Sequence, residues 1–534
     1  MFRKPVLILL ALLCLFAAMF ASASTASANG SGNVILVDTL DDTRHWEGNC
    51  SLRDAIMAAN TNRAQDGCKA GWVGHDTIEF APALQGHMIT LLGGQLDIYE
   101  PVTIQGHVKI DAQYRSRIFK SSTEGQVALS GLTLMHGKAD SGAGILVSNG
   151  SLKLYHITMR RNQAIQNGGA ISFPASESGR LIITSSDFTH NTAWGDGGAI
   201  YASGIDVNIY NGRFEHNYAT AHGGALYGEN ARIFTEITTY YRNNSRMGGA
   251  IYETNSFHQA FDNTFELNTA GSHGGGMMFV GGEARITKGW LDNNRSGRYG
   301  GAIAATEGAY LIISQTYMQL NRAERAGGAL FSMNSTINIS RSGIVLSWAG
   351  QNGGGLYAGM STFYVRNTDL LYNQAVKGGG IYSHAAYLSM NTVSLIANEA
   401  DIGGGLYSTV NPQHPDSEIT MSHVKIHNND ARNGAGIAHW IPANVSGNST
   451  VVLYDSEIFD NTGLDGTALF NHNAETYLFR TSVYRNAGNA INNPKGKVTL
   501  TQATLYDNQY NNCKGTIAMP EPYTNQDSDG SCMP

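Results

Sequence analysis

Four residues with basic or acid–base side chains occupy the same place in a short repeated motif, directly before its Asn. They are Arg161, His190, His216 and Arg242. Glu215, Asp196 and His222 stand nearby in the sequence. A polysaccharide lyase needs a base and a cation that neutralises a uronate carboxylate, often with calcium held by further carboxylates. One hypothesis is therefore cleavage of an extracellular polysaccharide, with His190, Glu215, His216 and Arg242 as candidate catalytic residues.

Several features of the sequence weigh against catalysis. The acidic residues are too scattered for a convincing calcium site, so the sequence indicates no cofactor, and calcium stays the one open alternative. Asn367-Thr-Asp369 matches part of a polygalacturonase signature, but the neighbouring Asp pair of such hydrolases does not follow it. A column of solvated turn residues explains the histidines equally well. We therefore treat a lyase or hydrolase as the second hypothesis.

A row of aromatic residues offers a different kind of site. Each follows the aliphatic residue that closes a glycine motif: Tyr201, Tyr227, Tyr252, Phe331, Tyr357, Tyr382, Tyr407 and Phe470, with Met278 and Ala304 interrupting the row. Exposed aromatic rows suit sugar rings, so the first seven are the predicted ligand-binding residues. The alternative is that neighbouring aromatics stabilise the sheet itself, by up to ~1 kcal/mol per pair.

The glycine motif determines the architecture that must position the candidate catalytic residues and the aromatic row. Pairs of glycine recur, each separated by one residue from a following Ile, Leu or Met, and successive clear copies are 25 to 29 residues apart. The clear copies close at Ile171, Ile200, Leu226, Ile251, Met277, Ile303, Leu330, Leu356, Ile381 and Leu406, and degenerate copies close at Ile145, Ile437, Leu469 and Ile491. Such a period is typical of a solenoid, in which each repeat buries its apolar face against its neighbours.

The segments between the glycine pairs predict strands. An apolar residue followed by two residues and Asn recurs in phase, as in Phe188 to Asn191 and Phe214 to Asn217, and short runs such as 181–184 are rich in β-branched residues. We therefore predict an all-β chain with a single right-handed parallel β-helix of about sixteen coils over residues 76–510, roughly 75 Å long. We expect the Asn column to satisfy backbone groups rather than a ligand.

Both ends of the rod need covers. Ser51 and Asp54 form a capping box, and Leu52, Ala55, Ile56 and Ala59 make one apolar face, so residues 29–75 predict an N-terminal cap with a short helix. Residues 511–534 predict a C-terminal cap or tail. Cys50, Cys68, Cys513 and Cys532 allow three pairings; proximity favours Cys50 with Cys68 and Cys513 with Cys532, and a zinc site is the alternative.

The first 28 residues resemble a secretory signal peptide, with Arg3 and Lys4 before an apolar run and small residues at its end. A membrane anchor is the alternative, but the run of 16 residues is short for a spanning helix, and no later stretch is long enough. Without residues 1–28, 33 basic and 42 acidic residues give a net charge of −9, which disfavours nucleic acid as a partner. We expect a secreted monomer.

The motif CSLRDAI, followed by HDTIEFAP, resembles the CSLREA-type N-terminal region of secreted bacterial right-handed β-helix proteins. The glycine and Asn repeats are similar to those of the chlamydial polymorphic outer membrane proteins, and together the resemblance covers roughly residues 33–510. It implies an exported, adhesin-like surface protein that reaches its compartment through the Sec pathway and binds glycans or another surface component. It carries over no catalytic residue.

Overall fold

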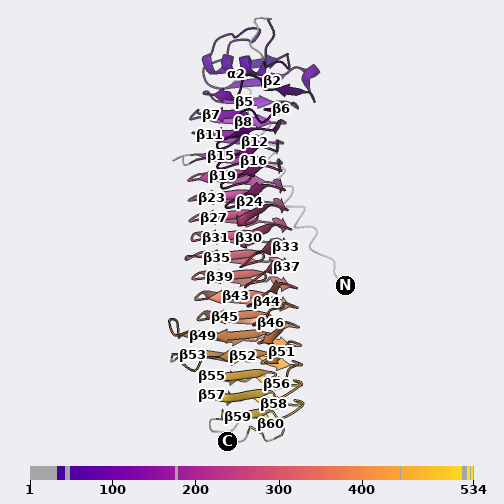
Figure 1. Ribbon diagram of the computed structural model, residues 1–534, viewed down its shortest axis with the longest axis vertical. Helices are drawn as coiled ribbons and strands as arrows, with labels where there is room; N and C mark the ends of the chain where they lie inside the picture. The colour runs from indigo at the N-terminus through magenta and orange to yellow at the C-terminus, as the bar shows by residue number, and fades with distance from the viewer. Residues whose placement is uncertain are drawn as a thin grey trace, which may run out of the picture.

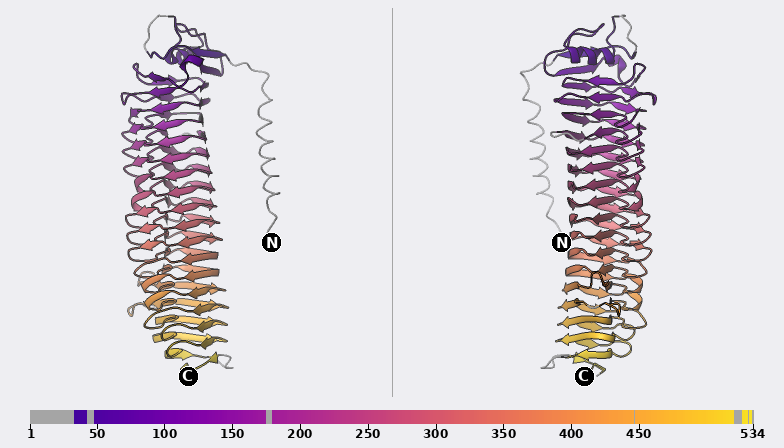
Figure 2. Two further views of the ribbon diagram at one scale, coloured as in Figure 1. Left: turned by 90° about the vertical axis from the view of Figure 1, so that its right-hand side faces the viewer. Right: turned by 60° about the vertical axis from the view of Figure 1, so that its left-hand side comes forward.

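The computed structural model describes residues 33–42, 48–174, 179–445, 447–519, 526–529 and 531–532. The chain winds into a right-handed parallel β-helix of about 17 turns, with 54% of its residues in strands and 3% in helix. Figures 1 and 2 show one continuous rod whose coils follow each other in sequence order along its long axis. The predicted fold is confirmed. The predicted signal peptide lies outside the described residues.

A regular coil contains four strands. One example is β19 (Ile200–Ser203), β20 (Asp206–Tyr210), β21 (Arg213–Glu215) and β22 (Tyr218–Ala219), which we call first to fourth strands. Each pairs in parallel with its counterpart one coil later, so Ile200 lies beside Leu226 and Phe214 beside Tyr240. The first three kinds of strand belong to a 49-stranded sheet, and nine fourth strands form a separate sheet. We call the outer surface of the nine-stranded sheet the fourth face.

Two sets of strands position the residues considered below. The first strands include β15 (Ile171–Phe173), β19, β23 (Leu226–Glu229), β27 (Ile251–Thr254), β31 (Met277–Val280), β35 (Ile303–Thr306), β39 (Leu330–Met333), β43 (Leu356–Gly359), β45 (Ile381–His384) and β48 (Leu406–Thr409). The nine-stranded sheet consists of β10 (Lys138–Ala139), β14 (Gln163–Ala164), β18 (Thr192–Ala193), β22, β26 (Asn244–Met247), β30 (Thr269–His273), β34 (Arg295–Ser296), β38 (Arg322–Ala323) and β42 (Trp348–Ala349).

The glycine pair makes the turn from a fourth strand to the next first strand. Gly223 has a φ of 61°, which a β-carbon would strain, and a β-carbon on Gly224 would collide with the carbonyl oxygen of Gly249 in the next coil. The residue that closes the motif then points inward, and Leu226 is fully buried. The repeat is therefore set by backbone geometry and close coil stacking.

The Asn column forms two buried ladders. Asn191 Nδ2 donates to Asn217 Oδ1 at 3.0 Å and to the carbonyl oxygen of Met159 at 2.9 Å, and the same pattern links successive coils. The ladder members are Asn162, Asn191, Asn217, Asn243, Asn268, Asn294 and Asn321, then, after Ser347, Asn373, Asn398, Asn429, Asn461, Asn486 and Asn508. These amides satisfy buried backbone groups, as expected.

The N-terminal cap is built from the residues of the CSLRDAI segment. Ser51 caps helix α2 (Leu52–Thr61), and its side chain accepts a hydrogen bond from Asp54 N. The guanidinium of Arg53 donates twice to the carboxylate of Asp42, both at 2.8 Å, and the amide of Asn60 donates to Asp97 O at 2.7 Å. The predicted helix and its buried face are confirmed, and the motif's polar residues bind it to the first coils.

Strand pairing extends into both terminal segments. Strand β1 (Val34–Val37), which precedes α2, already pairs in parallel with β2 (Asp76–Phe80). At the other end, β59 (Cys513–Ala518) pairs with β57 (Ile491–Thr501), and β60 (Gln526–Asp527) pairs with β58 (Thr504–Tyr506). The predicted disulfides Cys50–Cys68 and Cys513–Cys532 are both present. The terminal segments thus supply strands to the sheet as well as the disulfide-closed ends.

Candidate functional site

The aromatic row lies in register on the outer side of the first strands. Tyr201, Tyr227 and Tyr252 occupy paired positions, and the rings of Tyr201 and Tyr227 are 5.1 Å apart and nearly parallel. A second run, Phe331, Tyr357, Tyr382 and Tyr407, has ring centroids 4.8 to 5.2 Å apart. The ring faces are therefore occupied by neighbouring rings.

The prediction that these rings form an exposed row is wrong, because four of the seven, Tyr201, Tyr252, Tyr357 and Tyr382, are only partly exposed and the other three are buried. Tyr227, Phe331 and Tyr407 are only 9%, 5% and 4% exposed. Residues of the turns before some glycine pairs lie over the row: His222 is 4.5 Å from the ring of Tyr252, and Tyr299 stacks on Phe331 at 4.6 Å. Burial raises the pKa of Tyr357 to about 12. The row is therefore a packing ladder, and its predicted binding of sugars lacks the open ring faces on which it depended.

The candidate catalytic column lies at the turn after each third strand. His190, His216 and Arg242 have positive φ angles of 55°, 53° and 51°, and each immediately precedes a ladder Asn. The rings of His190 and His216 stack at 4.9 Å, and partial burial, with the charges of His216 and Arg161, lowers the pKa of His190. The positive φ identifies this column as a structural turn, with its histidine rings in contact.

The acids that accompany this column are not arranged for general acid–base chemistry with it. His216 Nε2 lies 3.9 Å from Glu215 Oε1, while Arg213 binds the other oxygen of Glu215 at 2.8 Å. Arg242 lies over the ring of Tyr241, 5.0 Å from its centroid. Asp196 pairs at 2.7 Å with His222 Nδ1, in the turn at the far end of the fourth strand. The seven residues therefore divide into two groups, one on each side of the fourth strands.

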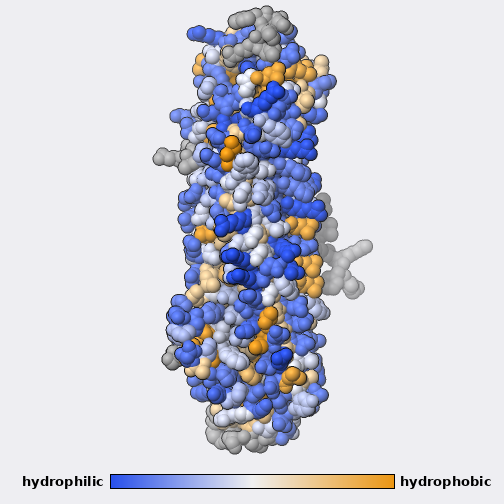
Figure 3. Space-filling view, in the orientation of Figure 1, coloured by the Kyte–Doolittle hydropathy of each residue, from blue (hydrophilic) through white to orange (hydrophobic). Residues whose placement is uncertain are grey.

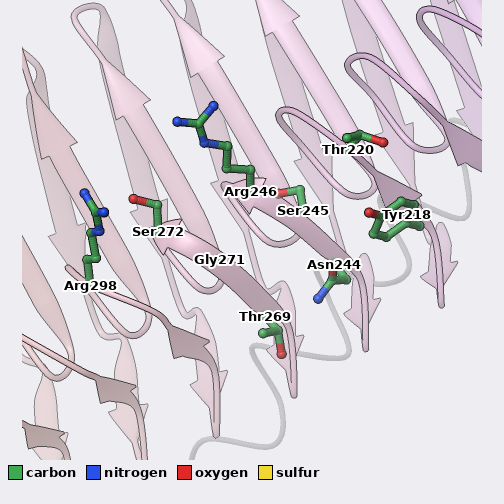
Figure 4. A pocket seen from close by; sticks show the side chains of 9 residues that line it. All are labelled: Tyr218, Thr220, Asn244, Ser245, Arg246, Thr269, Gly271, Ser272 and Arg298. Atoms are coloured by element: carbon green, nitrogen blue, oxygen red, sulfur yellow. The ribbon is translucent and has the colours of Figure 1, made fainter.

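A groove of about 440 Å³ lies between these two groups, on the fourth face. Figure 4 shows Arg246, Ser272 and Arg298 along one side and Tyr218, Asn244 and Thr269 along the other. The full lining is Tyr218, Thr220, Asn244, Ser245, Arg246, Thr269, Gly271, Ser272 and Arg298. None of these nine described residues is Asp, Glu or His, and none belongs to the predicted catalytic or aromatic set.

The groove lies at a coil whose turn is one residue shorter than those of the two adjacent coils. Four residues, 244–247, separate Asn243 from Gly248, whereas five, 218–222 and 269–273, fill the same interval in the adjacent coils. The pairing of β26 with β30 consequently slips in register between Ser245 and Met247. Sequence reasoning missed this site. Its only signal was the spacing of 25 residues from Leu226 to Ile251, between two spacings of 26.

The two arginines of the groove differ from their neighbours in lacking a carboxylate partner among the described residues. Arg246 and Arg298 are exposed, and neither forms an ion pair with a described carboxylate. By contrast, Arg295 and Arg322 on the same face both bind Glu324, at 2.7 and 3.2 Å. Because Arg246 and Arg298 have no such partner, a ligand need not displace one.

A scan against models of protein families and a search of curated proteins found no match to this chain. The resemblance to CSLREA-type and polymorphic outer membrane proteins therefore stays a prediction. Within the described ranges, no helix has the length and apolar character needed to cross a membrane. In the same ranges, His, Cys, Asp and Glu side chains do not gather in threes to form a metal site.

Proposed function

We propose that this chain is an exported, cell-surface or secreted β-helix that binds an extracellular glycan without cleaving it, and that the fourth-face groove holds the glycan. The lining of the groove carries this proposal. Thr220, Asn244, Thr269 and Ser272 offer hydrogen-bonding groups, and Tyr218, 43% exposed, offers an aromatic ring beside them. A few polar groups around an aromatic side chain are typical of carbohydrate sites.

The shape and surface of the rod favour a long polar partner. The groove crosses three successive fourth strands, so a linear polymer can lie along the axis and meet polar side chains in each coil. Figure 3 shows a face that is mostly hydrophilic, with hydrophobic residues in small separate clusters. A surface of this kind suits a glycan better than an apolar partner.

Cleavage by a lyase or hydrolase stays the second hypothesis, because His190, His216 and Glu215 do lie together. The two histidines project from the turn that precedes the ladder Asn and Glu215 from the end of the third strand, all outside the groove lining. A polymer held in the groove would be cleaved only if it also reached this turn. The structure therefore favours binding, and turnover is the outcome that would favour the second hypothesis.

The test is a binding array of neutral and acidic polysaccharides with the mature chain, with absorbance at 235 nm and reducing ends followed in parallel. We expect binding without turnover, and a loss of about ten-fold or more when Tyr218→Ala and Asn244→Ala are combined, since both side chains contact the ligand directly. Tyr155→Ala is the matched control, because Tyr155 is similarly exposed, at 47%, but lies on a second strand. Turnover that disappears in His216→Ala would reject the proposal.

A further inference from the structure

We infer that the glycan held by the groove is a polyanion, recognised through carboxylate or sulfate groups by a row of unpaired arginines on the fourth face. This inference rests on the proposed function and adds the ligand's charge to it. The row consists of Arg246, Arg298 and Arg325, and we call it the arginine row.

The arginine row follows the axis of the rod. The backbone N of Arg298 donates to Ser272 O, and that of Arg325 donates to Arg298 O, both at 2.9 Å, so these residues sit at equivalent positions in successive coils. Arg246 precedes Met247, which pairs with His273, so Arg246 is the counterpart of Ser272. With strands ~4.8 Å apart, cations recur about 10 Å and then about 5 Å along the axis.

The charge around the row is opposite in sign to that of the whole chain. The fourth face from β26 to the turn after β38 carries five arginines, at positions 246, 295, 298, 322 and 325, and one acid, Glu324. The full chain has a net charge of −7. Farther along, β47 (Glu399–Ile402) and β51 (Asp430–Asn433) carry three acidic residues, Glu399, Asp401 and Asp430, and one basic residue, Arg432. The positive region is therefore local to the groove and the coils that follow it.

The chemistry of arginine indicates the ligand groups. A guanidinium presents a planar fork of donors that matches a carboxylate or an oxyanion of sulfate in two-point contact. Arg246, Arg298 and Arg325 are all exposed, and none of them forms an ion pair with a described residue. Ser272, between Arg246 and Arg298, and Asn244 across the groove can hydrogen-bond sugar hydroxyls. A repeating acidic sugar supplies both kinds of group at regular intervals.

The experiment compares polymers that differ only in charge. Binding of the mature chain is measured for dextran sulfate against dextran, and for polygalacturonate against its methyl ester, at low and high salt. We expect the charged member of one or both pairs to bind, the neutral member to bind at least ten-fold more weakly, and affinity to fall as salt rises. The two pairs distinguish sulfate from carboxylate as the recognised group.

Variants then locate the contact. Arg246→Gln with Arg298→Gln should weaken binding by about ten-fold or more. Arg232→Gln with Arg366→Gln removes the same charge from exposed positions elsewhere and should leave affinity within about two-fold, with circular dichroism confirming that both variants fold.

Equal binding of neutral and charged members would overturn this inference and leave the proposed function standing. Binding of none of the polymers would overturn both, and equally tight binding of a double-stranded DNA fragment would also overturn the inference.

Discussion

The aromatic row takes one position from each coil, the fourth-face groove takes several, and the two regions have opposite properties. In the row, register is kept from coil to coil and the rings of Tyr357 and Tyr382 stack 5.1 Å apart, so each side chain is the partner of the next. In the groove, one residue is missing from the turn at 244–247, the register slips, and Arg246 is left exposed. Exact repetition therefore makes the scaffold, and the groove lies where the repetition is interrupted.

Removing a ring from the aromatic row should have a large effect, on stability alone. Phe331→Ala deletes a side chain that is 5% exposed and contacts the rings of Tyr299 and Tyr357, so we expect a loss of about 3 kcal/mol in the free energy of unfolding. Urea denaturation measures this loss, and glycan affinity at a temperature where the variant is folded should not change. A variant that kept its stability and lost affinity would assign binding to the row after all.

Low pH should lower the stability of the fold without changing the affinity of the groove for its ligand. His439 is fully buried between Thr476 and Ser449, and burial lowers its pKa from 6.5 to about 3. The unfolded chain takes up a proton below pH 6.5 that the folded chain does not, so stability falls as the pH drops from 6.5 toward 3, by at most ~1.4 kcal/mol per pH unit for this group.

Urea midpoints across this range measure the acid effect, and His439→Gln should flatten the slope. Arginine stays charged throughout, so affinity for dextran sulfate should stay constant wherever the chain is folded. A slope that is unchanged in His439→Gln would show that other groups account for the acid dependence. Affinity that followed the protonation of a histidine would point to the column of His190 and His216 instead.

Restoring the missing residue should have the smallest effect. A Ser inserted after Arg246 gives this turn the five residues of its neighbours, and we expect affinity to fall several-fold as the groove fills, with little change in unfolding free energy. The control is a Ser inserted after Val376, in a coil that also has four residues at this turn but lies outside the groove. Equal loss of affinity in both insertions would remove the link between the short coil and binding.

The fold was predictable because its determinants are local and repeated. Gly223-Gly224, the ladder Asn217 and the cap residue Ser51 each act through backbone geometry or a hydrogen bond that a short motif encodes. Exposure of the aromatic row was not predictable from alternation along a strand, because it depends on whether Tyr299 and His222 fold back from other segments to cover it. The groove lies where one coil differs from its neighbours in length. A comparison that looks for the motifs common to all coils does not reveal such a difference.

A crystal structure of the mature chain with an acidic oligosaccharide, the one whose polymer binds most tightly, tests the central claim most directly. The account predicts the oligosaccharide in the fourth-face groove, with its charged groups within hydrogen-bonding distance of Arg246 and Arg298. An oligosaccharide bound along the first strands at Tyr357 and Tyr382, or at the turn of His190 and His216, would contradict it.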